Sequence, residues 1–208
     1  KIDKIQKSKD GTIKNAVKRF DNLLVESVLI PVKNRTTACI SSQVGCSLDC
    51  EFCATSKLKR MRNLNADEIF DQVSTINLQS KLYYNRPISN IVFMGMGEPL
   101  LNYKNLLLGI KKITSNKGLG ISPKRITIST SGMSRIILKL ADEKIKFNLA
   151  ISLHSAIEET RNKIMPFSKK FPLIDLLESV KYWNKKTGKQ VTYEYIIWDK
   201  INDDLDHI

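Results

Sequence analysis

The stretch Cys46-Ser47-Leu48-Asp49-Cys50-Glu51-Phe52-Cys53 places three cysteines at the spacing C-x3-C-x2-C. Three thiolates this close can bind three irons of a four-iron cluster, because protein iron–sulfur clusters are held by cysteine thiolates. The fourth iron then has no protein ligand, and an open coordination site is where a metal centre does chemistry rather than only carrying electrons. The motif therefore predicts a reactive [4Fe-4S] cluster on Cys46, Cys50 and Cys53.

Two other uses of cysteine fit this motif less well. Structural zinc favours four ligands, commonly as two C-x2-C pairs, but there is no second pair, and the only histidines, His154 and His207, lie far downstream. A disulfide framework is typical of small secreted domains, whereas we expect no signal peptide here and find no transmembrane run. A zinc site that only stabilises the fold remains an alternative.

The composition indicates a polyanionic partner. The 208 residues contain 34 Lys and Arg against 21 Asp and Glu, a formal net charge of +13. Such an excess indicates a phosphate backbone as the first candidate, although a solvated basic surface explains it as well. The segment Lys57-Leu58-Lys59-Arg60-Met61-Arg62 follows the cysteine motif directly and is our candidate for an RNA or DNA contact. Four cysteines without a targeting segment favour the reducing cytoplasm.

Apolar runs and amphipathic segments alternate along most of the chain. Runs of strand length occur at Thr37–Gln43, Ser89–Met94, Arg125–Thr130, Phe147–Leu153 and Gln190–Ile197. Apolar residues at helical spacing predict helices that begin after Asn65, around Tyr103, at Ser134 and near Pro172. This alternation is typical of an α/β fold with a parallel sheet.

The chain divides in this interpretation into residues 1–36, an N-terminal β extension, and residues 37–208, the α/β core. In the extension, Ala16–Phe20 and Leu23–Pro31 can pair as a hairpin around the turn signal Asp21-Asn22. A parallel array of five strands leaves an unpaired edge, which proteins normally cover. We therefore expect a further strand or a partner at that edge.

Polar loops follow successive predicted strands. The cysteine motif, Gly97-Glu98, Ser129 and Ser152–His154 each stand at the carboxyl end of one strand. Ligands gather at the carboxyl ends of parallel strands, so we expect these loops to converge on one rim. There the glycines permit close backbone approach, and the Glu98 carboxylate can bind an ammonium group of a ligand.

Two further residues remain ambiguous from the pattern alone. Cys39 lies within a predicted buried strand, and it is either a small core residue or a reactive thiol directed at the cluster site. Glu26 lies between Val25 and Val28 in an N-terminal strand, where a lone glutamate is usually exposed to solvent.

Taken together, the motifs resemble those of radical S-adenosylmethionine (SAM) enzymes and, more closely, of the RlmN-type RNA methyltransferases. The matching stretches are Val25-Glu26, Cys39–Gln43, the cysteine motif, Phe93–Asn102, Ile128–Gly132 and Ala150–Ser155. The resemblance implies a partial (βα) barrel of the radical SAM type with a small N-terminal β-hairpin extension. It also implies methylation of C2 of adenosine in 23S ribosomal RNA and in tRNA.

The resemblance assigns a role to each motif. The cysteine motif would hold the cluster, and SAM would bind the open iron. The residues that would contact SAM are Gly97, Glu98, Ser129, Ser152, Leu153 and His154. An electron from the cluster splits SAM into methionine and a 5′-deoxyadenosyl radical. Radical chemistry is needed because C2 of adenine is electron-poor and its hydrogen is not acidic.

The resemblance also implies how product is released. Glu26 matches the family's proton acceptor, and Cys39 matches its second reactive cysteine, which forms a transient disulfide. The methyl group is carried by a cysteine near the family's C-terminus, and no cysteine follows Cys53 here. We therefore expect this chain to be a central fragment that binds the cluster and SAM but does not methylate RNA.

Two alternatives remain at this stage. Cfr-type relatives methylate C8 of the ribosomal adenosine, but their pattern has alanine where Pro99 follows the Gly-Met-Gly-Glu run here. The other alternative is a non-catalytic, metal-stapled nucleic-acid-binding module. For the enzyme, we expect ribosomal RNA, tRNA and an electron donor of the flavodoxin or ferredoxin type as partners, a monomeric state and no membrane.

Overall fold

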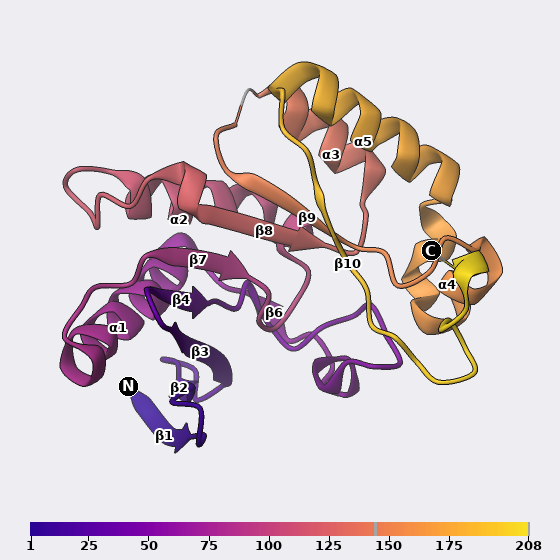
Figure 1. Cartoon of the computed structure of the whole chain (residues 1–208). Coiled ribbons are helices and arrows are strands. Elements are labelled where there is room, and N and C mark those ends of the chain that lie inside the picture. Colours follow the sequence, from indigo (N-terminus) through magenta and orange to yellow (C-terminus); the bar gives the residue numbers. More distant parts are fainter. Residues whose placement is uncertain (144, 208) are drawn as a thin grey trace.

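A computed structural model describes residues 1–143 and 145–207. Its main feature is an eight-stranded sheet in the order β1-β2-β3-β4-β7-β8-β9-β10 (Figure 1). The strands are β1 (Ile2–Lys7), β2 (Ile13–Lys18), β3 (Leu24–Val32), β4 (Arg35–Cys39), β5 (Gln43–Val44), β6 (Arg62–Asn63), β7 (Asn90–Phe93), β8 (Ile126–Thr130), β9 (Asn148–Ser152) and β10 (Thr192–Glu194). The helices are α1 (Ala66–Tyr84), α2 (Tyr103–Thr114), α3 (Ser134–Asp142), α4 (Glu158–Ile164) and α5 (Leu173–Thr187).

The sheet changes character at β4. Strands β1 to β4 pair antiparallel, whereas β4, β7, β8, β9 and β10 pair parallel. A helix connects each successive parallel pair, as such crossovers require. This confirms the predicted α/β fold, with a mostly parallel sheet and N-terminal antiparallel strands. Strand β3 pairs directly with β4, and the division at residue 36 stays a prediction.

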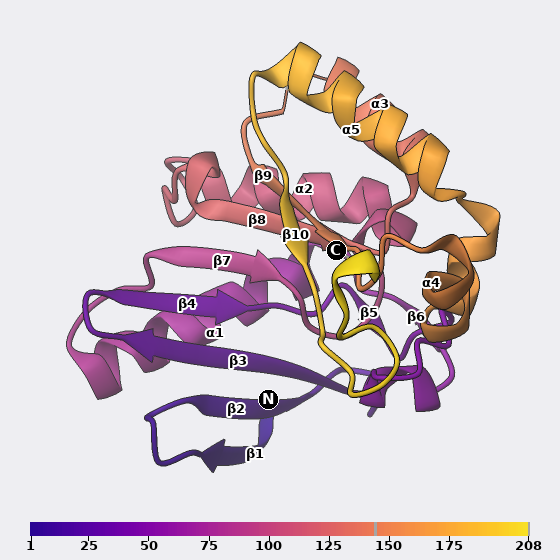
Figure 2. The same ribbon diagram turned by 45° about the vertical axis from the view of Figure 1, so that its right-hand side comes forward.

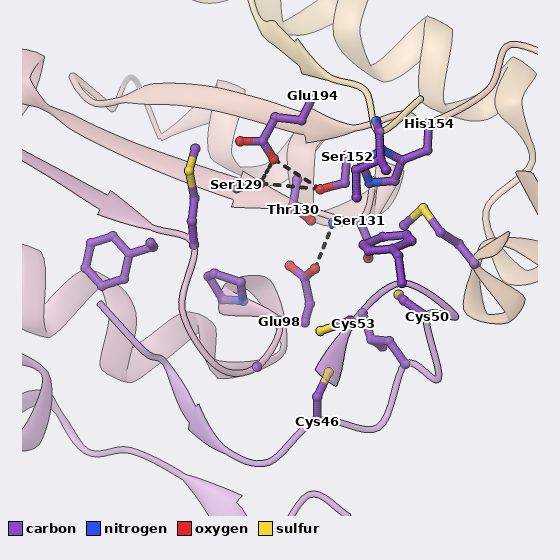
Figure 3. Close-up of a pocket in the computed structure, with 18 of the residues that line it drawn as sticks. Cys46, Cys50, Cys53, Glu98, Ser129, Thr130, Ser131, Ser152, His154 and Glu194 are labelled. Atoms are coloured by element: carbon purple, nitrogen blue, oxygen red, sulfur yellow. Dashed lines mark hydrogen bonds between the residues drawn. The ribbon is translucent and has the colours of Figure 1, made fainter. Parts of the chain in front are cut away.

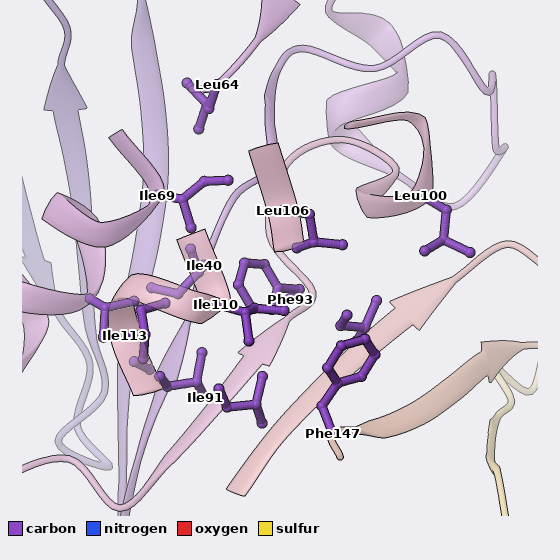
Figure 4. Packing of buried hydrophobic residues seen from close by; sticks show 14 of the residues in the cluster. Ile40, Leu64, Ile69, Ile91, Phe93, Leu100, Leu106, Ile110, Ile113 and Phe147 are labelled. Carbon is purple, nitrogen blue, oxygen red and sulfur yellow. The ribbon is translucent and has the colours of Figure 1, made fainter. Parts of the chain in front are cut away.

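The helices cover one face of the sheet and leave the other open (Figures 1 and 2). Ile91 and Phe93 on β7 pack with Ile69 of α1 and Leu106 of α2, and all four are at most 1% exposed (Figure 4). Because side chains alternate along a strand, the residues between these core positions face the open side. Polar residues at the ends of the strands can therefore face this open side.

Helix α1 begins as its sequence predicts. The Asn65 side chain accepts a hydrogen bond from the Glu68 amide, and the Glu68 carboxylate accepts one from the Asn65 amide, both at 2.9 Å. This reciprocal pair satisfies two amides that a helix start leaves without partners. The apolar face of α1, with Ile69, Val73 and Ile76, is completely buried.

Two strands end well before their predicted carboxyl ends. Thr37–Gln43 is not one strand, because β4 ends at Cys39 and the amides of Ser42 and Gln43 donate to the Met96 carbonyl instead of a neighbouring strand. Gln190–Ile197 forms only β10 (Thr192–Glu194), since the Ile196 amide donates to a histidine ring further along the rim. The helix α4 has no counterpart among the predicted elements. Among the described residues, no helix is long and apolar enough to cross a membrane.

Candidate active site

A cavity of about 420 Å³ opens at the carboxyl ends of the parallel strands, beside the cysteine loop (Figure 3). Its volume suits a ligand of cofactor size. The predicted site residues that line it are Cys46, Cys50, Cys53, Gly97, Glu98, Ser129, Ser152 and His154. These residues are spread over more than one hundred positions of the sequence, and the parallel topology brings them together at one rim.

The conformation of the cysteine loop is fixed by a glycine turn and by hydrogen bonds to its carbonyl groups. Gly45, with φ +73°, turns the chain into the loop, and a Cβ there would lie 2.2 Å from the Lys59 carbonyl oxygen. The Ser56 hydroxyl donates to the carbonyl oxygens of Cys50 and Cys53, at 2.8 and 2.6 Å. Figure 3 shows the three labelled sulfurs at the edge of the cavity, below Glu98. The sequence thus prearranges three sulfur ligands.

Two of the three thiols are harder to ionise than a free cysteine. Burial, together with the negative charges of the neighbouring Cys46 and Cys53, raises the pKa of Cys50 to about 12. Burial likewise raises the pKa of Cys46. Metal ligands must be deprotonated, so loading this site releases protons and replaces them with metal charge. In the described part of the chain, no three His, Cys, Asp or Glu side chains converge closely enough for a single ion. A cluster spreads its thiolates over separate irons, so it does not need that convergence.

Gly97 and Glu98 form the turn after β7. Gly97 has φ +91°, and a Cβ there would lie 2.4 Å from Cβ of Gln43, so only glycine fits. The Glu98 carboxylate, 3% exposed, accepts hydrogen bonds from the amides of Leu100 at 3.0 Å and Ser131 at 2.8 Å. Burial raises its pKa. A carboxylate can accept about four hydrogen bonds, so Glu98 keeps capacity for a cationic ligand.

A second acidic residue, Glu194, lines the cavity, and it was not among the residues predicted from the sequence. Oε2 of Glu194 accepts hydrogen bonds from the hydroxyls of Ser129 at 2.6 Å and Ser152 at 3.2 Å (Figure 3). Three adjacent strand ends thus form one polar wall. The signal was present, because Glu194 is the only acidic residue in Gln190–Ile197 and falls near the carboxyl end of the last parallel strand.

His154 presents a hydrogen-bond donor to the cavity. Its Nδ1 accepts from the Ile196 amide at 3.1 Å, so the proton of the neutral ring lies on Nε2. Burial, helped by the charge of Arg161, lowers the pKa of His154 to about 4, which keeps the ring neutral. Within the described residues, neither Nε2 of His154 nor the Ser131 hydroxyl has a hydrogen-bond partner. Both groups line the cavity, where a bound ligand can satisfy them.

Leu153 does not line this cavity. Its amide donates to the Glu194 carbonyl at 3.0 Å, and its carbonyl accepts from Arg161 at 3.2 Å. Its side chain lines a separate apolar groove beside α5. In this structure Leu153 holds the rim together through its backbone.

Glu26 and Cys39 lie outside the cavity lining, on the strands beside it. Cys39 pairs with Val28 across β3 and β4, and since Glu26 is two residues from Val28, both side chains share the open face of the sheet. Glu26 is half-exposed and pairs with Lys14 at 2.7 Å. Burial raises the pKa of Cys39 to about 11, and the negative charge of Glu194 contributes. The thiol is therefore protonated at neutral pH.

The basic segment after the cysteine motif is only partly free. Lys57, Lys59 and Arg60 are exposed, but Arg62 turns inward and pairs with Asp21 at 2.5 Å and with Glu68 at 2.8 Å. The prediction that all four cations face a phosphate backbone is therefore wrong for Arg62. Its charge is already neutralised within the protein.

The fold and this site define the class of protein. The profile of the radical SAM superfamily matches residues 40–208, and the chain belongs to that superfamily. A crystal structure of a radical SAM methyltransferase from Sphaerobacter thermophilus superimposes with a TM-score of 0.96 at 35% identity, covering 100% of this chain and 61% of that one.

The similar curated proteins narrow the relationship. A probable dual-specificity RNA methyltransferase RlmN from Flavobacterium psychrophilum is 64% identical over 208 residues, which are 100% of this chain and 60% of the relative. A protein of the same name from Thermus thermophilus is 42% identical over 198 residues, 95% of this chain and 56% of the relative. The chain thus spans about three-fifths of the length of these relatives.

Proposed function

We propose that this chain is the cluster- and SAM-binding part of an RlmN-type methyltransferase acting on C2 of adenosine in 23S ribosomal RNA and tRNA. The observation that carries the proposal is the single cavity that joins the cysteine loop to Glu98 and to the unpartnered donors of Ser131 and His154. The similarity to proteins named RlmN supports the choice of reaction and substrate.

The residues fit both implied cofactors. Cys46, Cys50 and Cys53 would hold the [4Fe-4S] cluster, and the cluster with SAM would supply a 5′-deoxyadenosyl radical. Glu98 would accept hydrogen bonds from the methionine ammonium with its remaining lone pairs, and His154 would donate from Nε2 to an acceptor on SAM. Glu98 and His154 are each 3% exposed, so bulk water screens these contacts poorly, which strengthens them.

The polar wall fits the ribose of SAM. A carboxylate that accepts from two hydroxyls in the protein can accept from sugar hydroxyls in the same way, as acidic residues do for ribose in dinucleotide sites. We therefore assign Ser129, Ser152 and Glu194 to the ribose. Glu26 as proton acceptor and Cys39 as the thiol that releases product are supported by their common place on the open face.

The exposed charges and the free cysteines support a set of proposed partners and a cellular compartment. The exposed Lys57, Lys59 and Arg60 would contact the RNA phosphates near the cavity. A one-electron donor of the flavodoxin or ferredoxin type would reduce the cluster. All four cysteines are unpaired in the structure, in keeping with a reducing cytoplasm, and we propose that the protein acts there as a monomer.

Anaerobic reconstitution with iron and sulfide tests the proposal. We expect a brown protein that yields 5′-deoxyadenosine with dithionite and SAM, and a Cys50→Ala variant that stays folded but colourless. A colourless, air-stable zinc protein without SAM affinity would instead support the metal-stapled module. No methylated adenosine is expected from these 208 residues alone. With the full-length protein, mass spectrometry of the RNA distinguishes C2 from the C8 position of Cfr-type enzymes.

A further inference from the structure

Arg161 on α4 is a buried cation with an unusual set of partners. It is 0% exposed. Its Nη2 donates to the carbonyl oxygen of Ser131 at 2.6 Å, and its Nε donates to that of Leu153 at 3.2 Å. These bonds tie the carboxyl ends of β8 and β9 to α4. Its partners on the protein are thus neutral backbone groups, which do not cancel its charge.

The guanidinium is not neutralised within the described part of the protein. There, no carboxylate lies within the 4.0 Å that defines an ion pair with Arg161, and its Nη1 has no hydrogen-bond partner. An unpaired buried charge is costly, and proteins normally provide a counter-charge. Burial indeed lowers the pKa of Arg161. The charge of Glu158 on the same helix partly opposes this shift, but no ion pair between Glu158 and Arg161 forms among the described residues. A directly contacting anion is therefore missing from this part of the protein.

The cysteine loop is the place where that anion would form. Ile164 and Met165, three and four residues after Arg161, pack against Cys46 and Cys50, and residues at this spacing share one helix face. The Glu51 amide of the loop also donates to the Ile164 carbonyl at 3.0 Å. These contacts join the cysteine loop to the helix that carries Arg161.

We propose that Arg161 is the counter-cation of the metal cluster bound by the three cysteines, and that its buried charge raises the reduction potential of that cluster. The inference rests on the proposed function. Reduction adds one electron, and hence one negative charge, to a centre already surrounded by thiolates, without forming or breaking a bond. A fixed positive charge in a poorly screened interior stabilises the reduced state more than the oxidised state.

The test is a potentiometric titration of the reconstituted 208-residue chain, followed by electron paramagnetic resonance in the absence of SAM. We expect Arg161→Met to shift the one-electron equilibrium about tenfold against the reduced cluster, which is about 59 mV to more negative potential. Arg161→Lys keeps the charge and should stay within a few-fold of the wild type. Lys163→Met removes the same charge two residues away, where the side chain is 74% exposed, and should change nothing.

The outcomes separate this inference from the proposed function. A wild-type chain that binds no cluster overturns both. An Arg161→Met chain with a full cluster and the wild-type potential overturns only the role of Arg161, and so does weaker SAM binding without a change in potential. If Arg161→Met does not retain iron, the Arg161→Lys variant is used for the test. If Arg161→Lys keeps the wild-type iron content and potential, the charge of Arg161 has the proposed role. If Arg161→Lys loses both, Arg161 only holds the strand ends together.

Discussion

The chain buries two glutamates to nearly the same extent. One of them belongs to the scaffold and the other to the candidate active site. Glu68 at the start of α1 is 4% exposed and Glu98 at the end of β7 is 3% exposed. Glu68 contacts two arginines, Arg19 at 3.0 Å and Arg62 at 2.8 Å. Glu98 accepts hydrogen bonds from the amides of Leu100 and Ser131, and among the described residues it forms no ion pair.

Their pKa values move in opposite directions. Burial acts to raise the pKa of Glu68, but hydrogen bonds from Arg62, the Asn65 amide and Arg19 lower it overall. Burial raises the pKa of Glu98, and the amide bonds do not compensate. The scaffold completes its charge pairs within the chain, whereas the site leaves a carboxylate without a cation. The difference shows where a ligand is required.

The largest effect should come from removing the unpaired charge in the site. We expect Glu98→Gln to weaken SAM binding by at least about 30-fold, because removing one partner of a buried charge pair costs about 2–5 kcal/mol. Isothermal titration calorimetry on the reconstituted chain measures this, with Glu51→Gln on the exposed part of the cysteine loop as the matched control. An unchanged dissociation constant would remove Glu98 from the SAM site.

Glu68→Gln should lower the stability of the protein and leave SAM binding unchanged. It leaves the buried Arg19 without its main carboxylate, so the free energy of unfolding should fall by about 3 kcal/mol, while the folded protein binds SAM as before. Urea unfolding followed by circular dichroism measures the loss, and Glu178→Gln, in an exposed pair with Lys181, is the control. A large loss of SAM affinity in the folded fraction would contradict the separation between scaffold and site.

The two glutamates should also give stability opposite dependences on pH. The pKa of Glu68 lies below its ordinary 4.5, so its contribution is complete above pH 4.5 and is lost as the pH falls through the folded-state value. The pKa of Glu98 lies above 4.5, so its ionisation reduces stability as the pH rises from 4.5 through the folded-state value. Each glutamine variant should therefore approach the wild type at low pH, where the carboxyl is protonated, when the metal-free proteins are unfolded. At higher pH, Glu68→Gln should be less stable and Glu98→Gln more stable than the wild type. Parallel curves would refute these shifts.

The smallest expected effect concerns Cys39. The charge of Glu194 adds to the effect of burial on the pKa of this thiol, so Glu194→Gln should raise the rate of Cys39 alkylation at fixed pH by no more than about threefold. Mass spectrometry of the Cys39 peptide after timed iodoacetamide treatment gives the rate. A slower reaction in the variant would show that Glu194 assists the thiol rather than suppressing it.

The elements that could be predicted are those governed by neighbours in sequence. Apolar residues at helical spacing predicted a helix from around Tyr103, where α2 begins, and a helix after Asn65, where α1 begins. The short helix α4 was not predicted, because seven residues without a capping side chain carry little local signal. It is nevertheless the helix that carries Arg161 to the cysteine loop.

By itself, the sequence determined the cysteine spacing, the glycines of the turns, and the strand–helix alternation that brings the loops to one rim. Only the tertiary structure decided which side chains complete the site. Glu194 meets Ser129 across 65 positions of the chain, and Arg161 meets Ser131 across 30. The structure also decided that Arg62 belongs to the scaffold. Local propensity acts between near neighbours, whereas a charge or hydroxyl acquires its partner only when distant segments pack together.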